Sequence, residues 1–125
     1  FGFFEDTTAE QTAEFAKEVY KLDSKLILKP TVEQIKDELK KGNLVVMGMA
    51  GRLLKNPYFT APGPIYHMLV IKGYNQNGFF VNDPGTRRGA NYHYFYEILM
   101  SAARDWGGSD ENILQTEPVA IVFLR

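Results

Sequence analysis

The spacing of hydrophobic residues in the first third of the chain predicts two helices. Apolar residues from about position 7 to 22 recur every three or four positions, while Glu and Lys occupy the other face. Thr8 and Gln11 stand at the start of this segment with the spacing of a capping box. A second segment, from about 32 to 41, repeats the pattern, with Thr31 as its cap and Gln34 at the position that completes a second capping box. We therefore expect two amphipathic helices.

Continuous apolar runs predict the strands. Residues 44–49 are apolar and partly β-branched, which is typical of a strand covered on both faces, so the second helix should pack on a sheet. The runs 66–74 and 78–82 are separated by a turn that contains Asn77-Gly78, a strong hairpin signal. Residues 119–124 form a further run near the end of the chain. These runs predict an antiparallel hairpin and two other strands.

The remaining segments are assigned from turn residues and spacing. Residues 25–29 are interpreted as a short apolar link between the two helices. Residues 51–64 are rich in Pro and Gly, and a loop of this length is more typical of a functional segment than of a plain connector. The apolar spacing over 92–103 predicts a third helix. Together the elements indicate an α+β domain in which helices pack on a small, mainly antiparallel sheet.

Composition and charge narrow the class of protein. The 125 residues fit a single domain, and 45% of them are hydrophobic, so the chain can build a folded core. A net charge of -1 gives no electrostatic footprint for nucleic acid. The apolar runs are far shorter than the roughly 18 residues that cross a bilayer. We therefore expect neither a nucleic-acid partner nor a membrane span.

The chain has 0 Cys, which excludes disulfides, thiolate metal sites and a cysteine nucleophile within these residues. It opens on Phe1, Gly2, Phe3 and Phe4. So many large apolar side chains normally pack against something. We therefore expect a further segment upstream of Phe1.

A His and an Asp lie at the two ends of the predicted hairpin. His67 begins its first strand and Asp83 follows its second, so antiparallel pairing brings the two positions together at one edge of the sheet. His67 is eight residues before the turn and Asp83 five after it, so contact requires a bulge or an oblique approach. A carboxylate beside an imidazole holds the ring and favours its charged form, as in a nucleophile–His–acid triad.

Other interpretations of these residues remain open at this stage. His67 can be a half-buried strand residue and Asp83 a turn former, because Asp before Pro-Gly is common in turns. His67, Asp83 and His93 together supply the ligand types of a metal site, which would make a small metal-dependent hydrolase, although no short ligand motif is present. The glycines form no nucleotide-binding loop, and the serines lie in no nucleophile elbow.

Three segments are similar, in this order, to those of one enzyme family. They are residues 31–46, with a helix, a Gly and an apolar strand; residues 67–74, which begin with His; and residues 79–84, which end in Asn-Asp-Pro. Together they resemble the bacteriocin-processing-like cysteine peptidases, papain-like enzymes that cleave double-glycine leader peptides. The resemblance implies a papain-like fold, with His67 as the general base that activates a thiol and Asp83 as the acid that orients the imidazole.

The chain departs from this family at the nucleophile. In the family a Cys opens a long N-terminal helix and a Gln a few residues earlier forms the oxyanion hole, whereas this chain has neither the Cys nor that segment. The nucleophile segment can lie outside the chain, or the protein can be a catalytically inactive pseudo-peptidase that binds peptides. We therefore expect residues 1–125 to be a single papain-like domain without its nucleophile helix.

The resemblance also sets expectations for partners. It implies a peptide or protein substrate and no cofactor. The absence of Cys is compatible with a secreted or a cytosolic protein, and a secreted or cell-envelope bacterial protein is slightly favoured. The sequence does not determine the oligomeric state.

Overall fold

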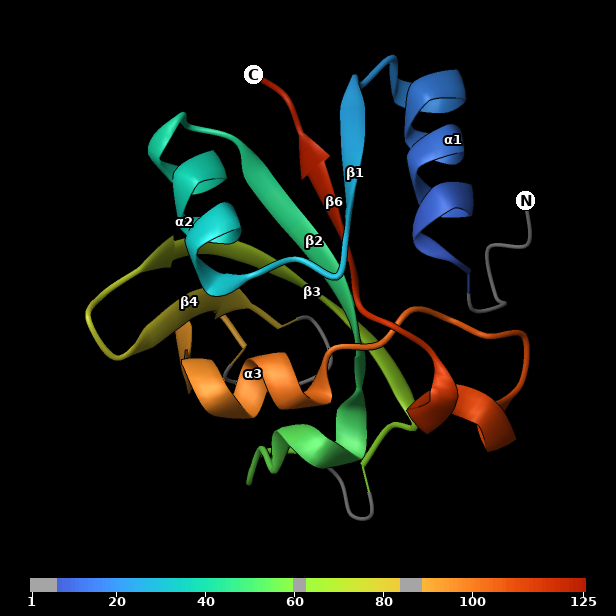
Figure 1. The fold of residues 1–125 in the computed structure, drawn as a ribbon, viewed down its shortest axis with the longest axis vertical. Coiled ribbons are helices and arrows are strands. Elements are labelled where there is room, and N and C mark those ends of the chain that lie inside the picture. Colours follow the sequence, from blue (N-terminus) through green and yellow to red (C-terminus); the bar gives the residue numbers. More distant parts are fainter. Residues whose placement is uncertain (1–6, 60–62, 84–88) are drawn as a thin grey trace.

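A computed structural model describes residues 7–59, 63–83 and 89–125. The described residues form a six-stranded sheet of order β1-β6-β2-β3-β4-β5, in which all neighbouring strands are antiparallel (Figure 1). The strands are β1 (Ser24–Leu28), β2 (Leu44–Ala50), β3 (Tyr66–Tyr74), β4 (Gly78–Asn82), β5 (Tyr92–Phe95) and β6 (Val119–Phe123). The helices are α1 (Ala9–Tyr20), α2 (Val32–Lys40) and α3 (Tyr96–Ala102), with 3-10 segments η1 (Gly51–Leu54) and η2 (Asp110–Gln115).

The first two helices begin where their capping residues predict. In α1, Thr8 accepts a hydrogen bond from the backbone N–H of Gln11, whose side chain accepts one from the backbone N–H of Thr8. Thr31 and Gln34 form the same reciprocal pair at α2. Each box satisfies backbone donors that no helical carbonyl reaches. Both boxes confirm the prediction, and the two helices end one or two residues earlier than expected.

Two segments differ from the prediction. Residues 25–29 are not a link, because Ser24–Leu28 is a strand that pairs with Val119–Phe123, almost a hundred residues later. Residues 92–103 are not one helix, because Tyr92–Phe95 is a strand paired with β4, and helix α3 starts only at Tyr96. In both cases the strand is formed by hydrogen bonds to a distant partner, and these override the local spacing.

The main core lies on the face of the sheet that α2 and α3 cover (Figure 1). Ile35 of α2 and Leu99 of α3 are fully buried there. The sheet contributes buried side chains at alternate positions of β2, β3 and β4: Val45, Met47, Met49, Leu69, Ile71, Phe79 and Val81. Helix α1 lies beside β1 and β6 and buries Ala9 and Ala16. This packing of helices on an antiparallel sheet confirms the α+β class.

Within the described ranges, no helix combines the length and the apolar character needed to cross a bilayer. Phe1, Phe3 and Phe4, at the N-terminal end of the sequence, lie outside the described residues.

Candidate active site

The β3–β4 hairpin places His67 and Asp83 on the same face of the sheet. Val70 pairs with Asn82 and Ile71 with Val81. If this register continues by one residue, Asp83 lies opposite Leu69. Leu69 and His67 are two residues apart on β3, so their side chains point to the same face of the sheet. The register shifts between Ile71 and Gly73, so the strand contains the bulge that the unequal spacing required.

The two side chains are in direct contact. Nε2 of His67 is hydrogen-bonded to Oδ1 of Asp83. The Asp83 side chain is completely buried, while that of His67 is 11% exposed and reaches the surface. Among the described residues, the other ring nitrogen, Nδ1, has no hydrogen-bonding partner. The imidazole is therefore held at one nitrogen and available at the other.

A tyrosine and an asparagine that sequence reasoning did not assign to the site extend this contact into the core. The hydroxyl of Tyr94 donates to Oδ2 of Asp83 at 2.8 Å. Nδ2 of Asn56, in the loop after η1, donates to the same hydroxyl at 2.9 Å. A buried carboxylate needs such partners, because an unpaired buried charge is strongly destabilising.

Burial keeps the tyrosine hydroxyls at the site neutral. Desolvation is the largest cause that raises the pKa of Tyr94 far above its ordinary value, and its hydrogen bond to Asp83 raises it further. The pKa of Tyr92, the next residue of β5 on this face, is also raised, mainly by burial and then by Tyr58 and Asp83. Tyr94 therefore acts as a hydrogen-bond donor throughout the neutral range.

Two loop residues complete the surroundings of the pair. The ring of Phe59 meets the ring of His67 edge-on, with centroids 5.3 Å apart. The backbone N–H of Asp83 donates to the carbonyl of Gly89 at 2.8 Å. These contacts fix the imidazole plane on one side and the backbone of Asp83 on the other.

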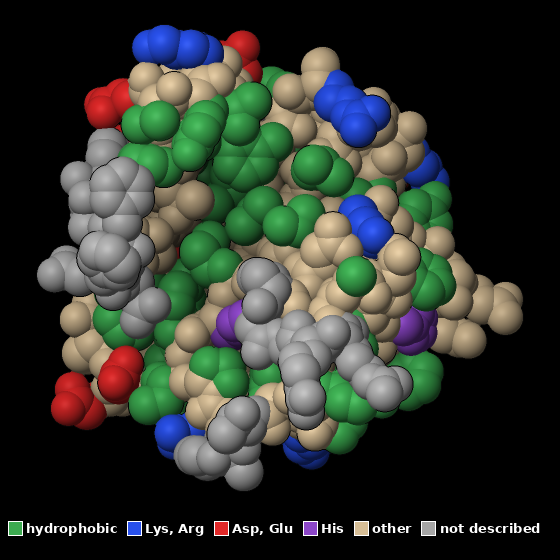
Figure 2. All heavy atoms as spheres, turned by 180° about the vertical axis from the view of Figure 1, so that it is seen from behind, with side chains coloured by type: hydrophobic (Ala, Val, Ile, Leu, Met, Phe, Trp, Pro, Cys, Tyr) green, Lys and Arg blue, Asp and Glu red, His purple; other side chains and the backbone are tan. Residues whose placement is uncertain are grey.

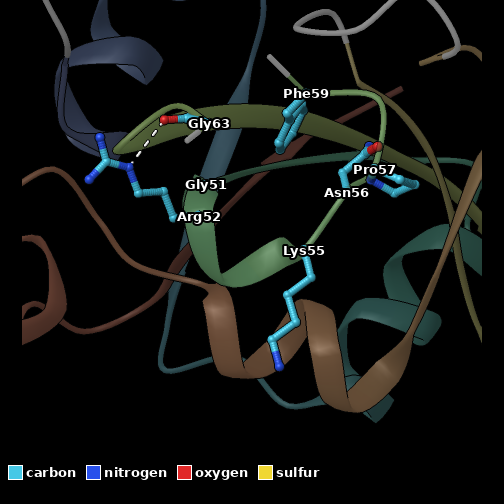
Figure 3. Close-up of a pocket in the computed structure, with 7 residues that line it drawn as sticks. All are labelled: Gly51, Arg52, Lys55, Asn56, Pro57, Phe59 and Gly63. Carbon is cyan, nitrogen blue, oxygen red and sulfur yellow. Dashed lines mark hydrogen bonds between the residues drawn. The ribbon is translucent and has the colours of Figure 1, made fainter. Parts of the chain in front are cut away.

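A cavity of about 260 Å³ lies at the segment that follows β2 (Figure 3). Its lining residues are Gly51, Arg52, Lys55, Asn56, Pro57, Phe59 and Gly63. Nε of Arg52 donates to the carbonyl of Gly63 at 3.2 Å, whereas the Lys55 side chain extends away from the other lining residues. Phe59 and Asn56 belong both to this cavity and to the surroundings of the His67–Asp83 pair, so the two features share a wall.

The structure does not bring His93 to the pair. His93 pairs with Phe80, so both point to the face opposite that of Val81 and Asp83, and Nε2 of His93 lies 3.1 Å from Oδ1 of Asn75. Figure 2 shows the two histidine side chains as separate patches. In the part of the chain that the structure describes, no three His, Cys, Asp or Glu side chains are grouped to hold a metal ion. The prediction of a His67–Asp83–His93 metal site is therefore not supported.

Comparison with known proteins identifies the family. The model of the Peptidase_C39 like family matches residues 4–111, which is most of the chain, and the chain therefore belongs to this family. It is a cysteine-peptidase-like domain with a papain-like fold.

A solved structure agrees with this fold. The crystal structure of a "putative C39-like peptidase" from Bacillus anthracis matches with a TM-score of 0.64 and 16% sequence identity. The match covers 100% of this chain and 64% of that one, so the present chain spans about two thirds of the length of its structural relative. No curated protein matches the chain.

Proposed function

We propose that the natural protein is a cysteine peptidase in which His67 and Asp83 work with a Cys from a segment outside these 125 residues. The hydrogen bonding of His67 carries this proposal, because Nε2 is held by a buried carboxylate while Nδ1 has no partner among the described residues. A general base needs this combination of a fixed ring and a free nitrogen. Membership of the Peptidase_C39 like family supports the same chemistry.

The proposed reaction is acyl transfer to the thiol followed by hydrolysis. Nδ1 of His67 takes the thiol proton, and the thiolate attacks the peptide carbonyl. The imidazolium, stabilised by Asp83, returns that proton to the leaving amine as the C–N bond breaks. His67 then takes a proton from water, whose oxygen attacks the thioester and releases the carboxylic acid and the thiol. Asp83 stays ionised throughout.

The cavity beside the pair suits one side chain of an extended peptide. Its volume of about 260 Å³ is below the roughly 300–1,000 Å³ of sites that enclose small-molecule ligands. Phe59 and Pro57 offer apolar contact, and Arg52 offers a polar group at its edge. We therefore expect a peptide or protein substrate and no cofactor.

The proposal is tested on the complete natural polypeptide, with thiol alkylation and peptide cleavage as readouts. We expect a Cys upstream of Phe1 whose alkylation abolishes cleavage. His67→Gln should lower kcat by about 10²–10⁴-fold, the usual effect of losing a general base. His93→Gln, on the opposite face of the sheet, is the matched control and should retain activity. A polypeptide without Cys, or an active His67→Gln variant, overturns the proposal.

The absence of Cys from these 125 residues favours a second candidate function, that of a pseudo-peptidase that binds peptides without cleaving them. It predicts that the complete natural polypeptide also lacks the nucleophile but binds extended peptides, and that Phe59→Ala weakens this binding in calorimetry. Absence of both cleavage and peptide binding contradicts this candidate as well.

A further inference from the structure

A chain of hydrogen bonds runs from the loop after η1 to the candidate catalytic pair. Asn56 donates to Tyr94 at 2.9 Å, and Tyr94 donates to Oδ2 of Asp83 at 2.8 Å. The other carboxylate oxygen of Asp83 holds His67. Asn56, Tyr94 and Asp83 are 6%, 3% and 1% exposed, so solvent competes little for these bonds. Three segments far apart in the sequence therefore meet through one buried chain of polar groups.

The direction of each hydrogen bond follows from the donors present. Oδ1 of Asn56 lies 2.8 Å from the backbone N–H of Tyr58, which can only donate, so the amide oxygen faces Tyr58 and the nitrogen faces Tyr94. The Tyr94 oxygen must then accept from Asn56 and turn its own proton to Asp83. The hydroxyl proton is thus aimed at the carboxylate.

From this arrangement we infer that Tyr94 is a positioning residue, held by Asn56, which fixes the Asp83 carboxylate and disperses part of its charge. Asp83 then keeps one oxygen on Nε2 of His67 and leaves Nδ1 free for proton transfer. This inference rests on the proposed function, because it assigns Tyr94 a role in setting the basicity of His67.

The groups facing the pair provide a matched control. Tyr92 and Tyr94 are two residues apart on β5, so their side chains point to the same face of the sheet, and their ring centroids are 4.7 Å apart. The ring of Tyr58, in the loop after η1, packs edge-on against the ring of Tyr92. Tyr92 interacts electrostatically with both Tyr58 and Asp83. Among the described residues, Tyr92 makes no hydrogen bond to Asp83. Tyr92→Phe therefore removes a hydroxyl beside the site without removing the bond in question.

The test measures the pKa of His67 by NMR titration in the complete natural polypeptide, with kcat and KM measured alongside. Tyr94→Phe removes one of the groups that disperse the charge of Asp83, so Asp83 stabilises the imidazolium more strongly. We expect the pKa of His67 to rise by about one unit, and kcat to fall about tenfold with KM unchanged. Tyr92→Phe should leave all three values at those of the natural protein.

A second variant tests the same inference from the other end of the chain of bonds. Asn56→Leu removes the amide donor to Tyr94 without adding a charge, so a change in the pKa of His67 then comes through the weakened Tyr94 contact and not from a new carboxylate. It should raise the pKa of His67 in the same direction, and it decides the question if Tyr94→Phe does not fold.

Each outcome separates this inference from the proposed function. Folded variants that keep the His67 pKa and kcat of the natural protein overturn the role of Tyr94, while the peptidase proposal stands. If Tyr94→Phe raises the His67 pKa but the natural polypeptide cleaves no peptide, the positioning contact stands and the proposed function falls. An equal effect of Tyr92→Phe overturns the specific role of Tyr94.

Discussion

The backbone of Asp83 is in close contact with Gly89. The N–H of Asp83 donates to the carbonyl of Gly89 at 2.8 Å, and a Cβ on Gly89 would lie 1.6 Å from the carbonyl oxygen of Asp83. No side chain fits at that distance unless the backbone moves. The position of Asp83, whose carboxylate is hydrogen-bonded to His67, therefore depends on the absence of a side chain at Gly89, six residues further along the chain.

Gly89→Ala should displace Asp83 and destabilise the domain. We expect a loss of about 1–3 kcal/mol in the free energy of unfolding, as for other overpacked sites, measured by urea denaturation. Gly73→Ala is the control, because a Cβ there meets no atom within 4 Å, and it should change stability by less than about 0.5 kcal/mol. If the two variants have the same free energy of unfolding, position 89 has room for a side chain beside the backbone of Asp83, and this explanation is wrong.

Asp83→Asn should abolish most of the proposed activity while the fold is retained. The amide can turn its NH₂ group to His67, which would then accept at Nε2 and carry its proton on Nδ1, the nitrogen that must take the thiol proton. Loss of the correct tautomer costs up to about 10⁴-fold in kcat in comparable triads. Peptide cleavage by the complete natural polypeptide measures this, and the exposed Asp110→Asn serves as the control. Full activity of Asp83→Asn would remove Asp83 from the mechanism.

Glu38 should make stability depend on pH. This carboxylate is 5% exposed and lies 2.8 Å from Nζ of Lys25 and 3.0 Å from Nδ2 of Asn43. The hydrogen bond from Lys25 is the largest cause that lowers the pKa of Glu38. Because the folded-state pKa is below the ordinary value of about 4.3, the stabilisation is complete above pH 4.3 and is lost as the pH falls through the folded-state pKa.

The variant Glu38→Gln measures this contribution. At pH 7 it should lower the free energy of unfolding by about 1 kcal/mol, a figure that allows for the solvent exposure of Lys25, and the difference should vanish in acid. The control is Glu33→Gln on the same helix, whose carboxylate is 75% exposed and should contribute little. A Glu38→Gln effect that is constant from pH 7 to pH 3 would contradict this explanation.

Local signals in the sequence were sufficient for most of the fold. The capping boxes at Thr8 and Thr31 satisfy backbone donors within the same turn, so their sequence is enough to locate α1 and α2. The hairpin was equally local, because its turn fixes the pairing of its strands. The segments 24–28 and 92–95 were mistaken because their strand structure comes from pairing with β6 and β4, which local spacing does not record. Residues 92–95 are rich in aromatic side chains, which are typical of strands, and this composition is the local feature that indicates β5.

The candidate site was predictable in part. The spacing of His67 and Asp83 in one hairpin allows their contact only with a bulge or an oblique approach, and the structure shows both the contact and a register shift between Ile71 and Gly73. The sequence pattern does not point to Tyr94 or Asn56, because the spacing over 92–103 predicts a helix and Asn56 lies within the predicted loop 51–64. Only the folded arrangement brings these distant residues to one carboxylate.

The most direct test of the proposed peptidase is the pH dependence of alkylation of the upstream Cys, followed by mass spectrometry of the complete natural polypeptide. A thiol paired with His67 ionises well below its ordinary pKa of about 8.5, so iodoacetamide should react with it at pH 6. In His67→Gln the thiol should regain an ordinary profile and react only as the pH approaches 8.5. Identical profiles for the two proteins, or a polypeptide that contains no Cys to alkylate, would contradict the proposal.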